Sequence, residues 1–190
     1  LSASRGEQHP HTLMALNNWA NVAYATGDYE TALRKHRDVQ AKRRSSLPAD
    51  DPDLAQSATN VAKSLWRLGR YAEAEAELAA SPAPGDDGAR RSRQLVLAEL
   101  RLARDDAEGA LLIARAVRSE IATAAPDVRG LAAARWIELR ALAATGAEGD
   151  ALKKALLDVD SALRRDEGRD FVDAAAVAAW RTAHLTPRSP

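Results

Sequence analysis

The hydrophobic positions of the chain recur with helical spacing over most of its length. In the first run, Leu13, Leu16, Trp19 or Ala20, and Ala23 follow one another at intervals of three or four residues. This spacing is typical of one face of an α-helix. Such runs predict helices at about residues 10–26, 29–44, 51–68, 72–80, 90–103, 107–125, 127–144, 151–165 and 170–184. The pattern therefore predicts an all-α fold.

Short glycine-containing turns separate the helices of each pair. The tripeptide Gly-Asp-Tyr at residues 27–29 recurs as Gly-Arg-Tyr at residues 69–71, and Ala32 and Ala74 each follow the Tyr by three residues. Glycine can end the first helix because it adopts the left-handed backbone that a tight reversal needs. We expect the Tyr to fill the gap between the two helices and the small Ala to let them approach closely.

The first two helix pairs are related by one fixed distance along the chain. Six pairs of identical residues lie 42 positions apart: Pro10 and Pro52, Asn18 and Asn60, Ala20 and Ala62, Gly27 and Gly69, Tyr29 and Tyr71, and Ala32 and Ala74. A helix–turn–helix unit that repeats is the sequence signature of an α-solenoid.

The repeat becomes degenerate in the second half of the chain. Two Pro and two Gly within residues 81–88 argue against helix there. We interpret this stretch as a loop inside one array, with a seam between two halves as the alternative. In the third unit Asp105 stands where Gly stood, and in the fourth Gly146 is kept but Glu148 replaces the Tyr. The final helix is expected to cover the last apolar face with one side, formed by Phe171, Val172, Ala175, Ala176, Ala179 and Trp180.

These boundaries predict one domain over the whole chain. It consists of repeat 1 at about 9–47, repeat 2 at about 51–80, a loop at 81–89, degenerate repeat 3 at about 90–125, degenerate repeat 4 at about 126–166 and a capping helix at about 170–185. Because the chain begins at Leu1 rather than Met, we expect it to be part of a longer protein.

Composition narrows the classes of function. Lys and Arg number 27 and Asp and Glu number 27, so the formal net charge is zero, which does not favour a general affinity for nucleic acid or anionic membranes. The absence of Cys excludes disulfides, thiolate zinc sites and thiol catalysis. No apolar run reaches the roughly 18 residues of a membrane span, and no signal segment is evident at the start. We expect a cytoplasmic protein without membrane insertion.

The titratable side chains form no catalytic or ligand-binding motif. There is no Ser–His–Asp arrangement, glycine-rich phosphate loop or helical His-Glu motif. His9 and His11 have no third metal ligand nearby in the sequence, and we expect His36 to be packed in the core or half-exposed. We therefore predict a protein that is not an enzyme and that uses no cofactor and no metal.

These features resemble tetratricopeptide repeats, and more narrowly the repeats of about 42 residues in kinesin light chains and many bacterial signalling proteins. Such repeats tend to open with His-Pro or Asp-Pro, to continue with Asn-Asn-hydrophobic-Ala, and then to give Gly-x-Tyr-x-x-Ala. The first copy reads His9-Pro10, Asn17-Asn18-Trp19-Ala20 and Gly27-Asp28-Tyr29 with Ala32, and the second reads Asp51-Pro52, Thr59-Asn60-Val61-Ala62 and Gly69-Arg70-Tyr71 with Ala74. The match is good over residues 9–80 and partial over residues 90–165.

The resemblance implies a right-handed α-solenoid of about four helix–turn–helix units plus a C-terminal capping helix, with a concave groove lined by the first helix of each unit. Family members typically bind an extended peptide or a partner helix in this groove. The Asn two residues before the small Ala often hydrogen-bonds the peptide backbone, which applies here to Asn18 and Asn60. By helical spacing, the remaining candidates in the groove are Asn17, Asn21, Tyr24, Thr59, Lys63 and Arg67, while Trp66 is placed either in the groove or in the core.

Each of these candidates has an ordinary structural alternative. The Asn side chains would equally suit hydrogen bonds to a neighbouring repeat or loop. The predicted function is a non-catalytic protein–protein interaction module that binds a peptide or partner segment and forms part of a larger bacterial signalling protein. The alternatives are an intramolecular regulatory domain of a serine/threonine kinase or signalling ATPase, which would contact other domains of its parent chain, and a self-association module.

Overall fold

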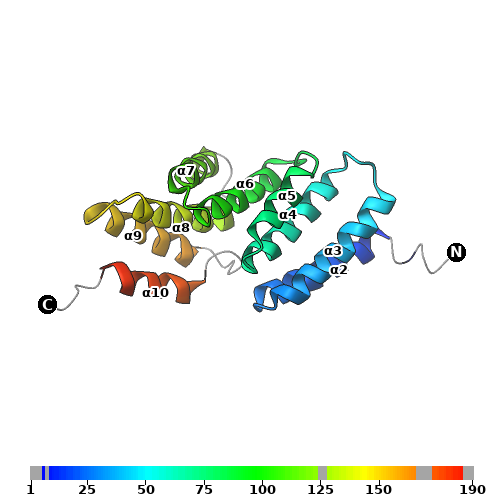
Figure 1. The fold of residues 1–190 in the computed structure, drawn as a ribbon, viewed down its shortest axis with the longest axis horizontal. Helices are drawn as coiled ribbons and strands as arrows, with labels where there is room; N and C mark the ends of the chain where they lie inside the picture. The colour runs from blue at the N-terminus through cyan, green and yellow to red at the C-terminus, as the bar shows by residue number, and fades with distance from the viewer. Residues whose placement is uncertain (1–5, 7–8, 124–127, 166–172, 186–190) are drawn as a thin grey trace. The chain divides into compact units, whose positions relative to one another are not determined.

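The structure is a computed structural model, which describes residues 6, 9–123, 128–165 and 173–185. Among these residues the fold is all-α, with nine labelled helices and no strand, which confirms the prediction of an all-α helical repeat (Figure 1). The helices are α2 (Pro10–Ala25), α3 (Tyr29–Ser46), α4 (Pro52–Arg67), α5 (Tyr71–Ala79), α6 (Asp87–Leu102), α7 (Ala107–Thr123), α8 (Val128–Ala144), α9 (Asp150–Arg165) and α10 (Ala174–Leu185).

The chain divides into two compact units, Leu1–Leu100 and Arg101–Pro190. The boundary falls near the end of α6, and not in the loop that the proline and glycine residues predict. That loop is also shorter than predicted, because α6 begins at Asp87. The side chain of Asp86 accepts a hydrogen bond of 2.7 Å from the backbone N–H of Ala89. This cap satisfies a donor of the first turn and allows the helix to start there in spite of Gly88.

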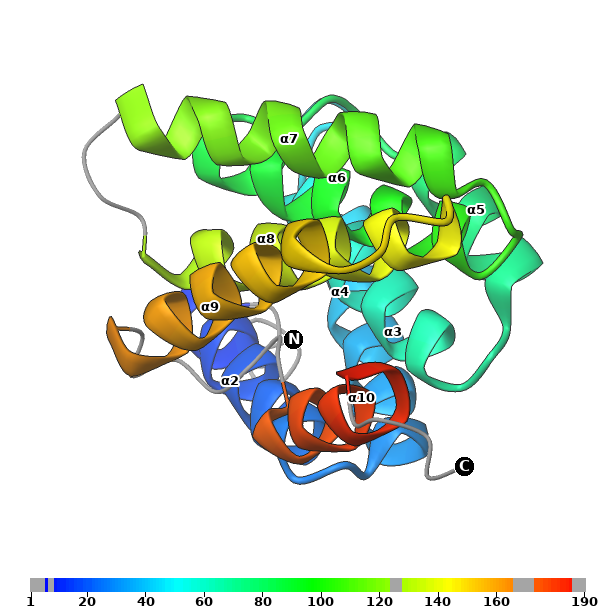
Figure 2. The same cartoon turned by 90° about the vertical axis from the view of Figure 1, so that its left-hand side faces the viewer.

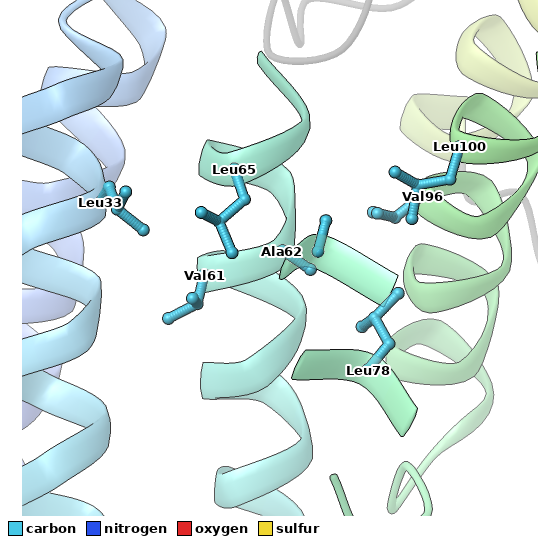
Figure 3. Close-up of a cluster of buried hydrophobic side chains, with 8 residues drawn as sticks. Leu33, Val61, Ala62, Leu65, Leu78, Val96 and Leu100 are labelled. Carbon is cyan, nitrogen blue, oxygen red and sulfur yellow. The ribbon is translucent and has the colours of Figure 1, made fainter. Parts of the chain in front are cut away.

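In the first unit, consecutive helices pack against each other: α2 against α3, α3 against α4, and α4 against α5. A cluster of buried side chains joins four of the helices (Figure 3). Its members are Leu33 from α3, Val61, Ala62 and Leu65 from α4, Ala74 and Leu78 from α5, and Val96 and Leu100 from α6. Burial of these apolar surfaces is the main stabilising term for helices of this length.

The turns between paired helices have the backbone that their glycines predict. Gly27 and Gly69 have φ angles of +85° and +73°. After Gly69, the N–H of Arg70 returns to the carbonyl of Leu65 at 2.9 Å, which closes the end of α4. Asp105 has a φ of +61° in the third unit and is the one non-glycine residue with positive φ among the described residues. Asp105 therefore takes the place of the turn glycine, since Asp tolerates this conformation better than most residues.

Of the tyrosines after these glycines, Tyr29 packs against α2 through an edge-on contact with Tyr24, whereas Tyr71 does not fill its turn. Tyr71 is 37% exposed, and Tyr29 is half-buried. A Cβ atom placed on Gly69 would have no other atom within 4 Å. A side chain at this position is therefore disfavoured by the left-handed backbone and not by a close contact at its Cβ atom. The small residues Ala32 and Ala74, in contrast, are completely buried.

Replacing Gly69 with Val should lower the free energy of unfolding by about 1–2 kcal/mol, because a β-branched residue is strained at positive φ even where space is open. Gly69→Asn should cost less, since Asn enters this region more readily. Urea unfolding of the three proteins measures both effects. Equal stability of the Val variant and the parent protein would contradict the assigned backbone role of Gly69.

In the second unit, α8 packs between α7 and α9 (Figure 2). Helix α10 contacts α8 through Trp180, whose ring meets that of Trp136 edge-on at 6.3 Å between centroids. The carboxylate of Asp160 in α9 pairs with Arg181 at 2.7 Å. Val177 is the buried residue of α10.

The predicted buried side of the last helix is largely wrong. Ala175, Ala176 and Ala179 are exposed, and Phe171 and Val172 lie outside the described residues. Helix α10 contacts the unit along Trp180, which the prediction included, and Val177, which it lacked, because these two large side chains bury more apolar area than three alanines.

Candidate protein-interaction surface

The first helices of the two N-terminal pairs are joined by a hydrogen bond between two Asn side chains. The Nδ2 of Asn60 in α4 donates to the Oδ1 of Asn17 in α2 at 3.0 Å. Asn17 and Asn60 are 43 residues apart, one more than the repeat distance. Asn60 therefore bonds the residue next to its counterpart Asn18 and not Asn18 itself. The hydrogen bond places this part of α2 beside α4.

Two of the predicted groove residues lie inside the unit. Asn60 is only 6% exposed, and its Oδ1 also accepts a hydrogen bond of 3.0 Å from Nε2 of Gln56. Thr59 is 2% exposed and donates its hydroxyl to the carbonyl of Ala55 at 2.9 Å. Asn60 thus hydrogen-bonds a neighbouring repeat. This is the structural role that was given above as the alternative to peptide binding.

The other predicted residues are at least partly accessible. Asn18, Asn21 and Arg67 are exposed, whereas Asn17, Tyr24, Lys63 and Trp66 are half-buried. Helical spacing aligns Asn21 and Tyr24 with Asn17 on α2, and Lys63 and Arg67 with Asn60 on α4. Because Asn17 and Asn60 are hydrogen-bonded, the row of residues on α2 and the row on α4 start side by side. We call the accessible residues Asn21, Tyr24, Lys63 and Arg67 the α2–α4 strip.

An aromatic cluster orders the Arg67 end of this strip. The Arg67 guanidinium lies over the ring of Tyr29, 4.6 Å from its centroid, and 5.4 Å from that of Trp66. It also donates a hydrogen bond to the Tyr29 hydroxyl. Tyr24 meets the Tyr29 ring edge-on at 5.4 Å. The sequence prediction omitted Tyr29 from the site because its place in the turn favoured a packing role.

The electrostatics of the strip are cationic. Lys63 and Arg67 are the charged members of the strip, and no carboxylate is among them. Burial and, to a smaller extent, the positive charge of Lys63 together lower the pKa of His36 in α3 to about 4. Both effects disfavour the protonated ring. An anionic group of a partner would meet no charge of its own sign within the strip itself.

A concave feature lies within the second unit, between α7, α8 and α9. Its volume is about 250 Å³, and it is lined by Arg115, Arg118, Arg135, Glu138, Leu142, Ala151, Lys154, Ala155 and Asp158. Arg115 and Arg118 both pair with the buried Glu138, at 3.0 and 3.1 Å. Sequence reasoning did not find this group, because its residues are scattered over three helices. Its lining holds more cationic than acidic side chains, and Glu138 pairs with two of the cations.

The described residues contain no group of three or more side chains that could hold a metal ion. Within the same ranges, no helix combines the length and the apolar character that crossing a bilayer requires.

Paired helices, glycine turns and a shared polar strip define an α-helical repeat protein. The family model for the tetratricopeptide repeat matches residues 11–81, which contain α2 to α5. Residues 11–81 are therefore similar to tetratricopeptide repeats. Tetratricopeptide repeats generally mediate protein–protein interaction.

One solved structure has a similar fold along most of the chain. It is described as a kinesin light chain from Podosopora anserina with nearly identical TPR-like repeats. The similarity has a TM-score of 0.54 at 19% sequence identity, and it covers 84% of this chain and 79% of that chain. At this identity the match shows the fold alone. No curated protein matches the chain.

Proposed function

We propose that this protein is a non-catalytic interaction module that binds an extended, mildly acidic segment of a partner protein along the α2–α4 strip. The observation that carries the proposal is the hydrogen bond between Asn17 and Asn60, which sets α2 beside α4. Accessible polar groups of both helices are then available to one ligand. The tetratricopeptide repeat match over residues 11–81 supports a protein as the partner.

The dimensions of the strip suit a short extended peptide. Arg67 follows Asn60 by seven residues, which corresponds to about 10 Å along an α-helix. About three residues of an extended chain span this distance. The exposed amide of Asn21 can both donate to and accept from a peptide backbone. Lys63 and Arg67 lie about one and two turns beyond Asn60, where they would pair with acidic side chains of the ligand.

The aromatic contacts of Arg67 favour this role. Its guanidinium is already held over Tyr29 and Trp66, so less side-chain freedom is lost when a carboxylate binds. A planar guanidinium can also bind a carboxylate through two hydrogen bonds. Because the strip is open to solvent, salt should weaken the interaction.

The test starts from a partner captured with the 190-residue chain. Reversing both charges, Lys63→Glu with Arg67→Glu, should weaken binding about tenfold or more, since two attractive contacts become repulsive. Calorimetric titration measures the dissociation constant, and urea unfolding checks that stability is retained. Lys153→Glu in α9 is the matched control, because Lys153 is an exposed lysine outside the strip. An unchanged dissociation constant for the doubly reversed protein would exclude the α2–α4 strip as the binding surface.

The setting of this module is also a proposal. We propose a cytoplasmic location within a larger bacterial signalling protein, where the acidic segment belongs to a separate chain. Two alternatives stay predictions. In the first, the bound segment belongs to the same parent chain, as in a kinase-associated regulatory domain. In the second, the module binds another copy of itself.

A further inference from the structure

Helix α2 has an exposed side that is apolar and uncharged. Met14, Trp19 and Val22 are each more than half exposed. Lys35 lies over the Trp19 ring, yet Trp19 is still 57% exposed. Helix α2 contains no charged residue, in a chain of which 28% of the residues are charged. Solvent-facing sides of helices are normally charged or polar, so this side has the composition of a covered surface.

The repeat shows what covers the equivalent side of α4. The 42-residue distance relates Trp19 to Val61 and Val22 to Ser64. Val61 and Ser64 are both completely buried. Val61 belongs to the same buried cluster as Leu33 of α3, the helix that precedes α4 and packs against it (Figure 3). The side of α4 that α3 covers therefore corresponds to the exposed side of α2.

Asn18 extends the same comparison to a polar contact. Its counterpart Asn60 is buried and donates to Asn17 of the preceding first helix. Asn18 itself is exposed. Helix α4 contacts the preceding pair, α2 and α3, through an apolar stripe and an amide. The exposed face of α2 offers the same two features.

We propose that this outer face of α2, formed by Met14, Ala15, Asn18, Trp19 and Val22, docks a helix pair of a partner helical-repeat segment. The second helix of that pair would lie on α2 as α3 lies on α4, and its first helix would offer an amide to Asn18. This surface is distinct from the α2–α4 strip and does not depend on the function proposed for it.

The differences between α2 and α4 define the chemistry of the docking helix. In α3, Arg43 donates to Ser57 at 2.8 Å and pairs with Asp53 at 3.0 Å. The positions equivalent to Ser57 and Asp53 in α2 are Ala15 and His11. An arginine would have neither partner there and would be costly to bury. The docking helix therefore carries an apolar residue in the place of Arg43.

The test supplies such a helix pair in the same chain. A second copy of residues 9–50, with Arg43→Leu in that copy, is inserted before His9 and restores the 42-residue distance. Hydrogen exchange of residues 10–25 in the original α2 should become about tenfold slower or more, and the urea midpoint should rise. Trp19→Glu in the original α2 should abolish both gains. Leu157→Glu is the matched control, because Leu157 is an exposed leucine of α9, 64% accessible, and should leave the gains intact.

Two results would overturn the proposal. The first is unchanged exchange of α2 in an extended chain whose added helices are shown to be folded by circular dichroism. The second concerns the occupant and uses the 190-residue chain itself in sedimentation velocity. A monomer is expected, whereas a dimer that dissociates on Trp19→Glu would show that a second copy of the chain covers this face.

Discussion

Lowering the pH from about 6.5 to about 4 is expected to reduce the free energy of unfolding by about 3 kcal/mol through His36 alone. His36 is 3% exposed, and its Nδ1 atom has no hydrogen-bond partner among the described residues. Burial, and secondarily the charge of Lys63, lower its pKa from 6.5 to about 4 in the folded protein. Between these two values the unfolded chain binds a proton that the folded chain does not. Stability is therefore full above pH 6.5 and is lost progressively as the pH falls toward 4.

The control for this prediction is His36→Phe, which keeps a bulky ring but cannot titrate. Urea unfolding at pH 7, 5.5 and 4.5 should show a steep loss of stability in the parent protein and a much flatter profile in the variant. The carboxylates of Asp28, Glu73 and Asp87 have pKa values lowered by hydrogen bonds from Thr31, Arg70 and Arg90 respectively. These carboxylates are present in both proteins, so their contribution to the pH dependence cancels in the comparison. Equal pH dependence of the two proteins would mean that His36 is not held neutral by burial.

Asn60→Ala is expected to lower the free energy of unfolding by about 1–3 kcal/mol. The substitution removes the donor to Asn17 and the acceptor of Gln56, each at 3.0 Å. Both partner side chains are half-buried, so water replaces the lost hydrogen bonds incompletely. Urea unfolding at neutral pH gives the difference directly.

Asn18→Ala is the matched control, because Asn18 occupies the equivalent position in α2 but is exposed. Its stability should stay within about 0.5 kcal/mol of the parent protein. Equal losses for the two variants would contradict the distinction between a buried and an exposed amide. If Asn18→Ala weakens binding of a captured partner without changing stability, Asn18 contributes to the binding surface as the sequence predicts.

The sequence alone determined the helices and the turns of this protein. A helical period of apolar residues depends only on neighbours along the chain, so the ends of α2 to α5 could be placed within about two residues. The same holds for Gly27 and Gly69, whose positive φ follows from the need to reverse the chain. Even the substitution of Asp105 for glycine was visible from its place in the repeat.

The tertiary structure alone decided which faces are covered. Helical spacing shows that Asn17, Asn18 and Asn60 lie on first helices, but it does not show which of them meet. The pairing of Asn60 with Asn17 depends on how α4 lies beside α2, a non-local contact that the 42-residue repeat does not specify. For the same reason the placement of Trp19 on the buried apolar face was wrong, since Trp19 is 57% exposed although its counterpart Val61 is completely buried. A helix carries its apolar pattern in its own sequence, whereas the burial of that pattern depends on the neighbouring helix.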